Sequence, residues 1–156
     1  MNSFVAALLH PEVQHYLQEN AQAYPVEIAL KDIHIQQVRS AELANQIKQK
    51  QKAEKKLPLY FNTQHIIYPK GISIEQCSSE ATAWVKVKLM KQFIQTDFIS
   101  FSDLTGGFGV DTFFIGQHFE KIVYIEPNGE LLTIAQHNHQ ILQLKNAVYQ
   151  NINAEE

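Results

Sequence analysis

The sequence predicts an α/β fold: three parallel strands joined by helices, preceded by a small helical region. Within residues 98–150, three short apolar runs alternate with two segments of helical periodicity, and a glycine-rich turn follows the first run. Strands joined through helices of this length need crossover connections, which favour a parallel sheet. The chain of 156 residues is 45% hydrophobic and 19% charged, which excludes a wholly disordered or fibrous protein.

Residues 1–56 are predicted to be mainly helical. Apolar residues recur there at helical spacing, and prolines stand where helices begin or end. Ser40 is a candidate N-cap for the longest helix, which ends before Pro58 and carries an apolar stripe of Leu43, Ala44 and Ile47. We therefore expect helices that begin near Pro11, Pro25 and Ser40.

The periodicity changes after residue 57. Apolar residues alternate with polar ones, or form short runs between turn signals, at residues 59–61, 66–68 and 72–74. This pattern predicts two or three short strands or extended pieces.

An amphipathic helix should follow over residues 80–95. Ser78 or Ser79 can serve as its N-cap, and Glu80 lies in the first turn, where a negative charge is favoured. Its buried stripe is expected to be Ala83, Trp84, Val87 and Met90.

Residues 98–150 are predicted to form the sheet and the helices that cross it. We expect strands over residues 98–101, 121–125 and 147–150. A helix over residues 110–118 joins the first two strands, and Asn128 opens the helix that leads to the third. That last helix should bury Leu131, Leu132, Ala135 and Ile141.

The candidate site lies where these strands end. The segment 103–111 joins a strand to a helix, and its glycines let the backbone approach a ligand closely. Glu126 follows Gly106 by twenty residues and ends the next strand, where a ribose would present its hydroxyls. A strand-to-helix turn can need glycine for its backbone conformation alone. The order of strand, acid, glycine turn, helix, strand and acid instead favours a nucleoside cofactor.

The glycine pattern separates two kinds of cofactor. A dinucleotide fingerprint has a third glycine three residues after the second, and Thr112 stands at that position after Gly109. Asp103 would repel a pyrophosphate but could pair with the ammonium of an amino acid. A ribose at one end and an ammonium at the other describe S-adenosyl-L-methionine. The residues therefore favour this methyl donor over NAD. A nucleotide-dependent oxidoreductase stays a further, less favoured hypothesis.

Three segments carry a family resemblance. The segment DLTGGFG at 103–109 resembles the first motif of class I SAM-dependent methyltransferases, and IVYIEPN at 122–128 resembles their second. The stretch over residues 103–138 is similar to the trimethylguanosine synthase and guanine-N2 RNA methyltransferase branch. The preceding IEQCSSEATAWVKVKL resembles bacterial methyltransferases that carry a C-terminal THUMP-like domain. The resemblance covers roughly residues 57–156, where it implies the first half of a Rossmann-like methyltransferase sheet; it adds little to the helical region predicted over 1–56.

The resemblance also implies roles for individual residues. Asp103, Gly106 and Gly109 would line the methionine end of the cofactor, and Glu126 would hold the ribose. The loop before the helix at residue 80 would touch the methionine carboxylate, although an ordinary helix cap explains its serines equally well. The complete set of cofactor-binding candidates is Gln76, Ser78, Ser79, Asp103, Thr105, Gly106, Gly107, Gly109, Asp111, Glu126, Pro127 and Asn128.

The acceptor-binding motif of the family is not found in this sequence. The fourth strand of the family brings an Asn/Asp-Pro-Pro-aromatic segment, and no two prolines are adjacent here. We therefore assign no catalytic residue; nor do the scattered histidines and the single cysteine suggest a metal ligand set. We expect the N-terminal, cofactor-binding portion of an RNA-directed methyltransferase that is not catalytically competent as an isolated chain. The alternative is a non-catalytic interaction or RNA-binding module that retains a methyltransferase-like half-fold.

The distribution of charged and apolar residues indicates which partners and location to expect. Residues 48–96 hold nine lysines against three acids, most densely over 48–56, whereas both flanks are net acidic. This run is either a solvated helix end or a surface for RNA. The first strand would leave an exposed sheet edge that a second copy of the chain could cover. The longest apolar run has six residues, and Cys77 is the one cysteine, so we expect a cytoplasmic protein without a membrane anchor.

Overall fold

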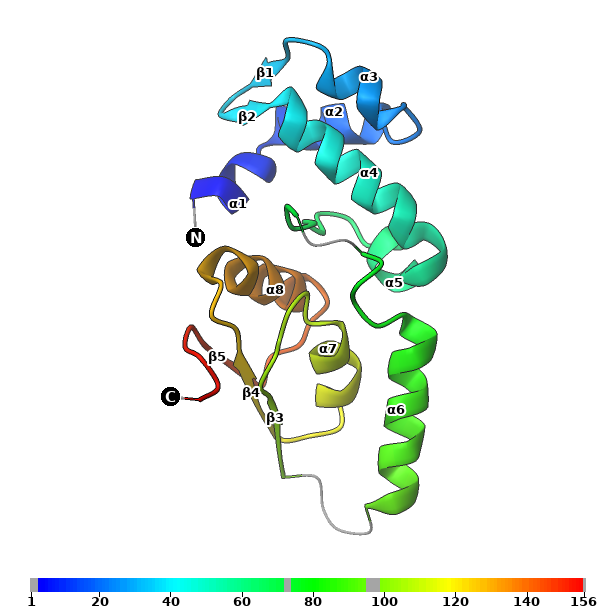
Figure 1. The fold of residues 1–156 in the computed structure, drawn as a ribbon, viewed down its shortest axis with the longest axis vertical. Coiled ribbons are helices and arrows are strands. Elements are labelled where there is room, and N and C mark those ends of the chain that lie inside the picture. The colour runs from blue at the N-terminus through cyan, green and yellow to red at the C-terminus, as the bar shows by residue number, and fades with distance from the viewer. Residues whose placement is uncertain (1–2, 72–73, 95–98, 156) are drawn as a thin grey trace. The chain divides into compact units, whose positions relative to one another are not determined.

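The computed structural model describes residues 3–71, 74–94 and 99–155. Its contacts divide the chain into two compact units, Met1–Gln76 and Cys77–Glu156 (Figure 1). The sequence places a boundary after residue 56, whereas residues 57–76 belong with the helices that precede them.

The first unit contains five helices and one short hairpin among its described residues. The helices that were expected to begin near Pro11, Pro25 and Ser40 are present. The backbone N–H of Arg39 bonds the Glu42 carboxylate (3.1 Å), so the N-cap lies one residue before Ser40. The hairpin was not predicted. The elements are α1 (Ser3–Leu8), α2 (Pro11–Glu19), α3 (Pro25–Ala29), β1 (His34–Ile35), β2 (Val38–Arg39), α4 (Ser40–Lys56) and α5 (Pro58–Asn62).

The strand expected around residues 59–61 is wrong. Pro58 stands in the first turn of α5, where its fixed φ and missing N–H are compatible with a helix. Leu57 and Tyr60 are fully buried and three residues apart, which is helical spacing on one face. Residues 66–69 belong to no helix or strand, residues 70–71 form a bend, and residues 72–73 of the expected third piece lie outside the described residues.

Side-chain amides of α4 form hydrogen bonds with the backbone of this segment, which a neighbouring strand would provide in a sheet. Gln46 donates to the Tyr68 carbonyl (2.6 Å) and accepts from the Tyr68 N–H (2.9 Å), so one amide satisfies both backbone groups of a buried residue. Asn45 donates to the carbonyl of Pro69 (3.3 Å), and the N–H of Ile74 bonds Gln49 (3.4 Å). Because buried backbone groups need partners, these bonds attach the backbone of Tyr68, Pro69 and Ile74 to α4.

Replacing Gln46 by alanine should destabilise the first unit by about 2 kcal/mol, because the buried Tyr68 loses both of its backbone hydrogen bonds to the Gln46 amide. Hydrogen exchange would show faster exchange of the Tyr68 amide. Lys48→Ala, on an exposed position of the same helix, is the matched control and should change neither quantity. Equal exchange in both variants would contradict the role given to Gln46.

The second unit contains the predicted parallel sheet. Its strands β3 (Ser100–Asp103), β4 (Lys121–Ile125) and β5 (Ala147–Gln150) lie in the order β3-β4-β5, and both pairings are parallel. The helices are α6 (Glu80–Phe93), α7 (Val110–Gly116) and α8 (Gly129–Ile141). The α/β fold class is confirmed. Residues 95–98 lie outside the described residues, and they include the expected end of α6 and the expected start of β3.

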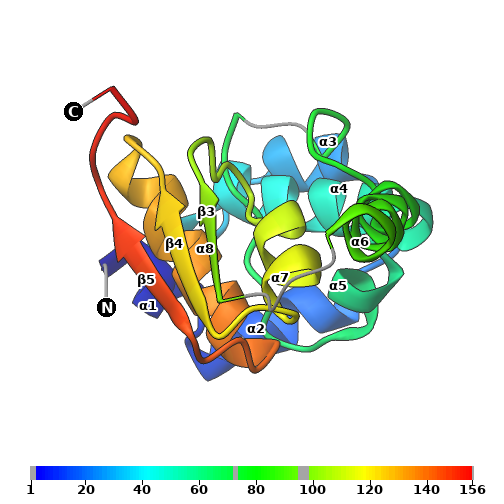
Figure 2. The same cartoon turned by 90° about the horizontal axis from the view of Figure 1, so that it is seen from below.

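Both crossover helices cover the same face of the sheet. The Tyr124 ring lies beside His139 of α8, and Ile122 lies against Gly116 of α7, so the two helices share the face to which these strand residues point (Figure 2). On the opposite face of the sheet, Val123 is half-buried and Val148 is exposed, whereas Ile125 at the end of β4 is buried. In the described part of the chain, no helix is both long and apolar enough to cross a membrane.

The expected buried stripes are only partly correct. In α6, Ala83 and Val87 are buried, whereas Trp84 is 50% exposed and contacts Phe114 edge-on with its ring. In α8, Leu131 and Ala135 are buried as expected, but Leu132 and Ile141 are only half-buried. Their places in the core are taken by Ile134, Asn138 and His139.

Candidate cofactor site

A glycine-rich loop lies at the carboxyl ends of β3 and β4. The N–H of Gly106 bonds the last carbonyl of β4, at Ile125 (2.9 Å), and the N–H of Gly109 bonds the carbonyl of Gly106 (2.9 Å). Gly107 and Gly109 have φ values of 58° and 80°, in the left-handed region that favours glycine. The loop is therefore a tight turn anchored to the neighbouring strand.

Two of these glycines are required by close packing. A Cβ on Gly106 would overlap the ring of Tyr124, and a Cβ on Gly109 would lie 2.5 Å from Nε2 of His139. A Cβ on Gly107 would meet only the carbonyl oxygen of Thr105, at 3.6 Å. The open side of the loop is thus at Gly107, and the packed sides are at Gly106 and Gly109.

Glu126 is held in one orientation by backbone donors. Its Oε2 accepts from the N–H of Gly107 (3.0 Å), and its Oε1 accepts from the N–H of Asn128 (2.8 Å). The residue is 8% exposed. Each carboxylate oxygen can accept a further hydrogen bond, because two lone pairs are available on it. Pro127 and Asn128 follow at exposed positions, and Asn128 also caps α8 through its side chain.

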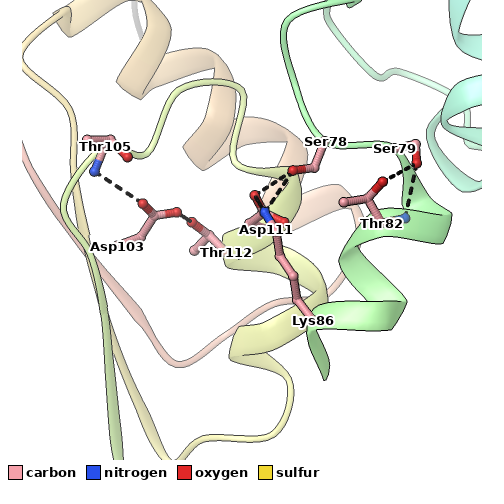
Figure 3. A network of polar contacts seen from close by, with 8 residues as sticks. All are labelled: Ser78, Ser79, Thr82, Lys86, Asp103, Thr105, Asp111 and Thr112. Carbon is pink, nitrogen blue, oxygen red and sulfur yellow. Dashed lines mark hydrogen bonds and ion pairs between the residues drawn. The ribbon is translucent and has the colours of Figure 1, made fainter. Parts of the chain in front are cut away.

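Asp103 is held in the same way at the end of β3. One of its oxygens accepts from the N–H of Thr105 (3.2 Å), and the other accepts from the hydroxyl of Thr112, which is fully buried (Figure 3). Thr105 itself is exposed. Two carboxylates therefore flank the glycine loop, each at the end of one of two adjacent parallel strands.

Asp111 connects α7 to the loop before α6. Its Oδ2 accepts from Ser78 Oγ (2.7 Å) and from Lys86 Nζ (2.6 Å), while its Oδ1 is buried without a hydrogen-bond partner in the described chain (Figure 3). Ser79 is the N-cap of α6 and accepts from the N–H of Thr82 (3.0 Å). Gln76 is an exposed residue of the first unit, so its cofactor contact stays a prediction.

Three side chains that support the loop were not identified from the sequence. His139 Nε2 donates to the carbonyl of Gly109 (2.8 Å), and its Nδ1 then accepts from the hydroxyl of Tyr149 (2.9 Å). The hydroxyl of Tyr124 donates to the carbonyl of Gly107 (2.6 Å). Burial lowers the pKa of His139 to about 4 and raises the pKa of both tyrosines. These rings keep the loop carbonyls turned toward the protein.

Asn151 was also missed. Its Nδ2 donates to the carbonyls of Glu126 and Pro127, at 2.8 Å each, and so connects the end of β5 to the end of β4. Its position just after a predicted strand is the signal that could have identified it.

The fold and the loop together define a Rossmann-like α/β unit of the methyltransferase type. A protein from Porphyromonas gingivalis W83, provisionally named a methyltransferase, matches the chain with a TM-score of 0.71 and 26% sequence identity. The match covers 92% of this chain and 34% of the other, so the chain spans about a third of the structure it matches. No protein-family model and no curated protein matches the chain.

Proposed function

We propose that the chain is the cofactor-binding part of a SAM-dependent methyltransferase that acts on RNA. The observation that carries this proposal is the pair of oriented carboxylates, Asp103 and Glu126, on either side of a glycine loop at the ends of adjacent strands. In open α/β sheets, ligands bind at the carboxyl ends of the strands. The methyltransferase-type neighbour supports the same cofactor class.

The residues present fit this cofactor chemically. Glu126 would accept hydrogen bonds from the two ribose hydroxyls, because its backbone donors leave further lone pairs available. Asp103 would pair with the ammonium of the methionine moiety. The open side of Gly107 gives the ligand access to the loop backbone. When bound, S-adenosyl-L-methionine supplies a methyl group activated by its positively charged sulfur.

The remaining candidates have supporting roles in this proposal. Pro127 and Asn128 would lie beside the adenine, and the loop before α6 would approach the methionine carboxylate. Asp111 would hold that loop in place through Ser78. The buried Oδ1 of Asp111 is a free acceptor in the same loop network.

RNA as the acceptor is supported by the sequence resemblance and by the charge of α4. Lys52 bonds the Glu75 carboxylate (2.7 Å), and Lys56 bonds the Glu75 carbonyl (2.6 Å). Three other lysines of this helix have no carboxylate within ion-pair range in the described chain: Lys48, Lys50 and Lys55. Unpaired lysines can neutralise phosphates.

Calorimetric titration with S-adenosylhomocysteine tests the cofactor assignment. Glu126→Gln and Asp103→Asn should each weaken binding on the order of tenfold to a hundredfold, the loss expected for hydrogen bonds to a charged group. Glu130→Gln is the matched control, because Glu130 is exposed in the first turn of α8 and its carboxylate has no partner in the described chain. Thermal melts of each variant would separate loss of binding from loss of fold.

Two results would contradict the proposal. One is wild-type affinity in both variants despite intact folding. The other is salt-dependent RNA binding by a wild-type chain that does not bind S-adenosylhomocysteine, which would favour the non-catalytic module.

A further inference from the structure

A cleft of about 410 Å³ lies within the first unit, and none of its lining residues is assigned to the cofactor. It is bounded by α2, α4 and the segment 63–68. The volume falls in the range of pockets that hold small ligands. Its lining includes amide groups, imidazole rings and one ammonium beside apolar side chains such as Leu17, Ile47 and Ile66; the polar groups used below are those of Gln14, Gln18, Gln64, His15, His65 and Lys50.

The electrostatics of the cleft favour an anionic ligand. No aspartate or glutamate is among its lining residues. Lys50 has no carboxylate partner in the described chain, and its Nζ lies 5.8 Å from the centre of the Phe61 ring. Glu19 pairs with His15 (3.2 Å) but does not line the cleft. An ammonium without a nearby anion is a binding point for a phosphate.

The amide groups of the cleft are of two kinds. Gln14 is fixed, because its Nε2 donates to the carbonyl of Leu8 (2.7 Å) and its Oε1 accepts from Nδ1 of His65 (3.2 Å). Gln18 and Gln64 are exposed, and their side chains make no hydrogen bond in the described chain. A free glutamine amide offers a donor and an acceptor side by side, which matches the edge of a nucleobase.

His65 has an unusual backbone conformation. Its φ is 63°, in the left-handed region, which few non-glycine residues adopt and which histidine adopts more often than most. Here it places the His65 ring at the cleft, bonded to Gln14.

We propose that this cleft binds one unpaired nucleotide of an RNA strand. Lys50 contacts the phosphate, Gln18 and Gln64 bond the edge of the base, and the imidazoles offer ring faces for stacking. Proteins recognise single-stranded RNA through the same combination of base-edge hydrogen bonds, stacking and phosphate contacts. This inference rests on RNA as the acceptor in the proposed function, and it adds a site that is independent of the cofactor.

The test is the binding of a fluorescent single-stranded RNA oligonucleotide of mixed sequence to the full chain. Lys50→Gln should weaken binding by roughly fivefold to tenfold and lower the salt slope by about 0.7, the value for one phosphate contact on a single strand. Lys55→Gln removes the same charge from an exposed position of α4 outside the cleft, so it removes only the general attraction of α4 for phosphate and should weaken binding less than about twofold. The double variant Gln18→Ala, Gln64→Ala should weaken binding but leave the salt slope unchanged.

Three outcomes would overturn the inference. Equal weakening by Lys50→Gln and Lys55→Gln would show that RNA is attracted by the charge of α4 in general and not by a specific contact with Lys50. Absence of RNA binding by the folded wild-type chain would show that RNA is not the ligand of the cleft. Equal affinity for free adenosine or uridine monophosphate and for the oligonucleotide would exclude RNA as the source of the nucleotide. Titration of the same variants with S-adenosylhomocysteine keeps this result separate from the cofactor assignment, because Lys50→Gln should leave that affinity unchanged.

Discussion

Gly109→Ala should lower the free energy of unfolding of the second unit by about 3 kcal/mol or more. The left-handed φ of 80° costs a residue with a side chain about 1–2 kcal/mol. The added Cβ would also lie 2.5 Å from Nε2 of His139, which must then move and lose its bond to the Gly109 carbonyl. Because His139 is fully buried, the structure has little room for that movement.

Denaturant unfolding monitored by tryptophan fluorescence would measure this loss. Trp84 is the single tryptophan, and its contact with Phe114 makes it a reporter of α6 and α7 packing in the second unit. Gly107→Ala is the matched control, since Gly107 has a φ of 58° but open space around its Cβ. It should cost about 1–2 kcal/mol. Equal losses in the two variants would show that backbone conformation alone explains both glycines.

The stability of the second unit should fall by about 3 kcal/mol as the pH is lowered from 6.5 to 4, through His139 alone. Burial lowers the pKa of this imidazole to about 4 in the folded state, whereas its ordinary value is 6.5. Between these values the unfolded chain binds the proton and the folded chain does not, so acid favours unfolding. Above pH 6.5 both states are neutral and the effect vanishes; below pH 4 it is complete.

His139→Gln isolates this contribution. Glutamine can still donate to the Gly109 carbonyl but does not titrate, so the variant should lack the loss between pH 6.5 and 4 even if it is less stable at every pH. His118, whose pKa is also lowered, remains in both proteins as a common background. Parallel stability curves for the wild type and the variant would contradict the assignment of this pH dependence to His139.

The second unit could be predicted from the sequence because its signals are local. The strand at residues 121–125, the cap at Asn128 and the glycine turn are each recognisable within a few residues. Strands and helices that alternate in this way leave few possible topologies. The positions of Asp103 and Glu126 at neighbouring strand ends follow directly from that topology.

The first unit was harder to predict because its decisive contacts join residues far apart in the sequence. The segment around Tyr68 resembles a strand in composition, but its backbone bonds the side chain of Gln46 and not another strand. The same limit applies to His139, since nothing in the segment around it shows that its ring meets Gly109, thirty residues earlier. Hydrophobic periodicity does not identify a buried polar side chain of this kind.

The fit between Gly106 and the ring of Tyr124 has a consequence for the evolution of this protein. A side chain at 106 becomes possible only after the aromatic ring at 124 has been lost, and losing the ring first opens a void and frees the Gly107 carbonyl. Either single substitution is costly, so a change from glycine and an aromatic ring at 106 and 124 to another pair of residues would require substitution at both positions. Positions 106 and 124, although they lie on different elements, should therefore vary together among descendants of a common ancestor.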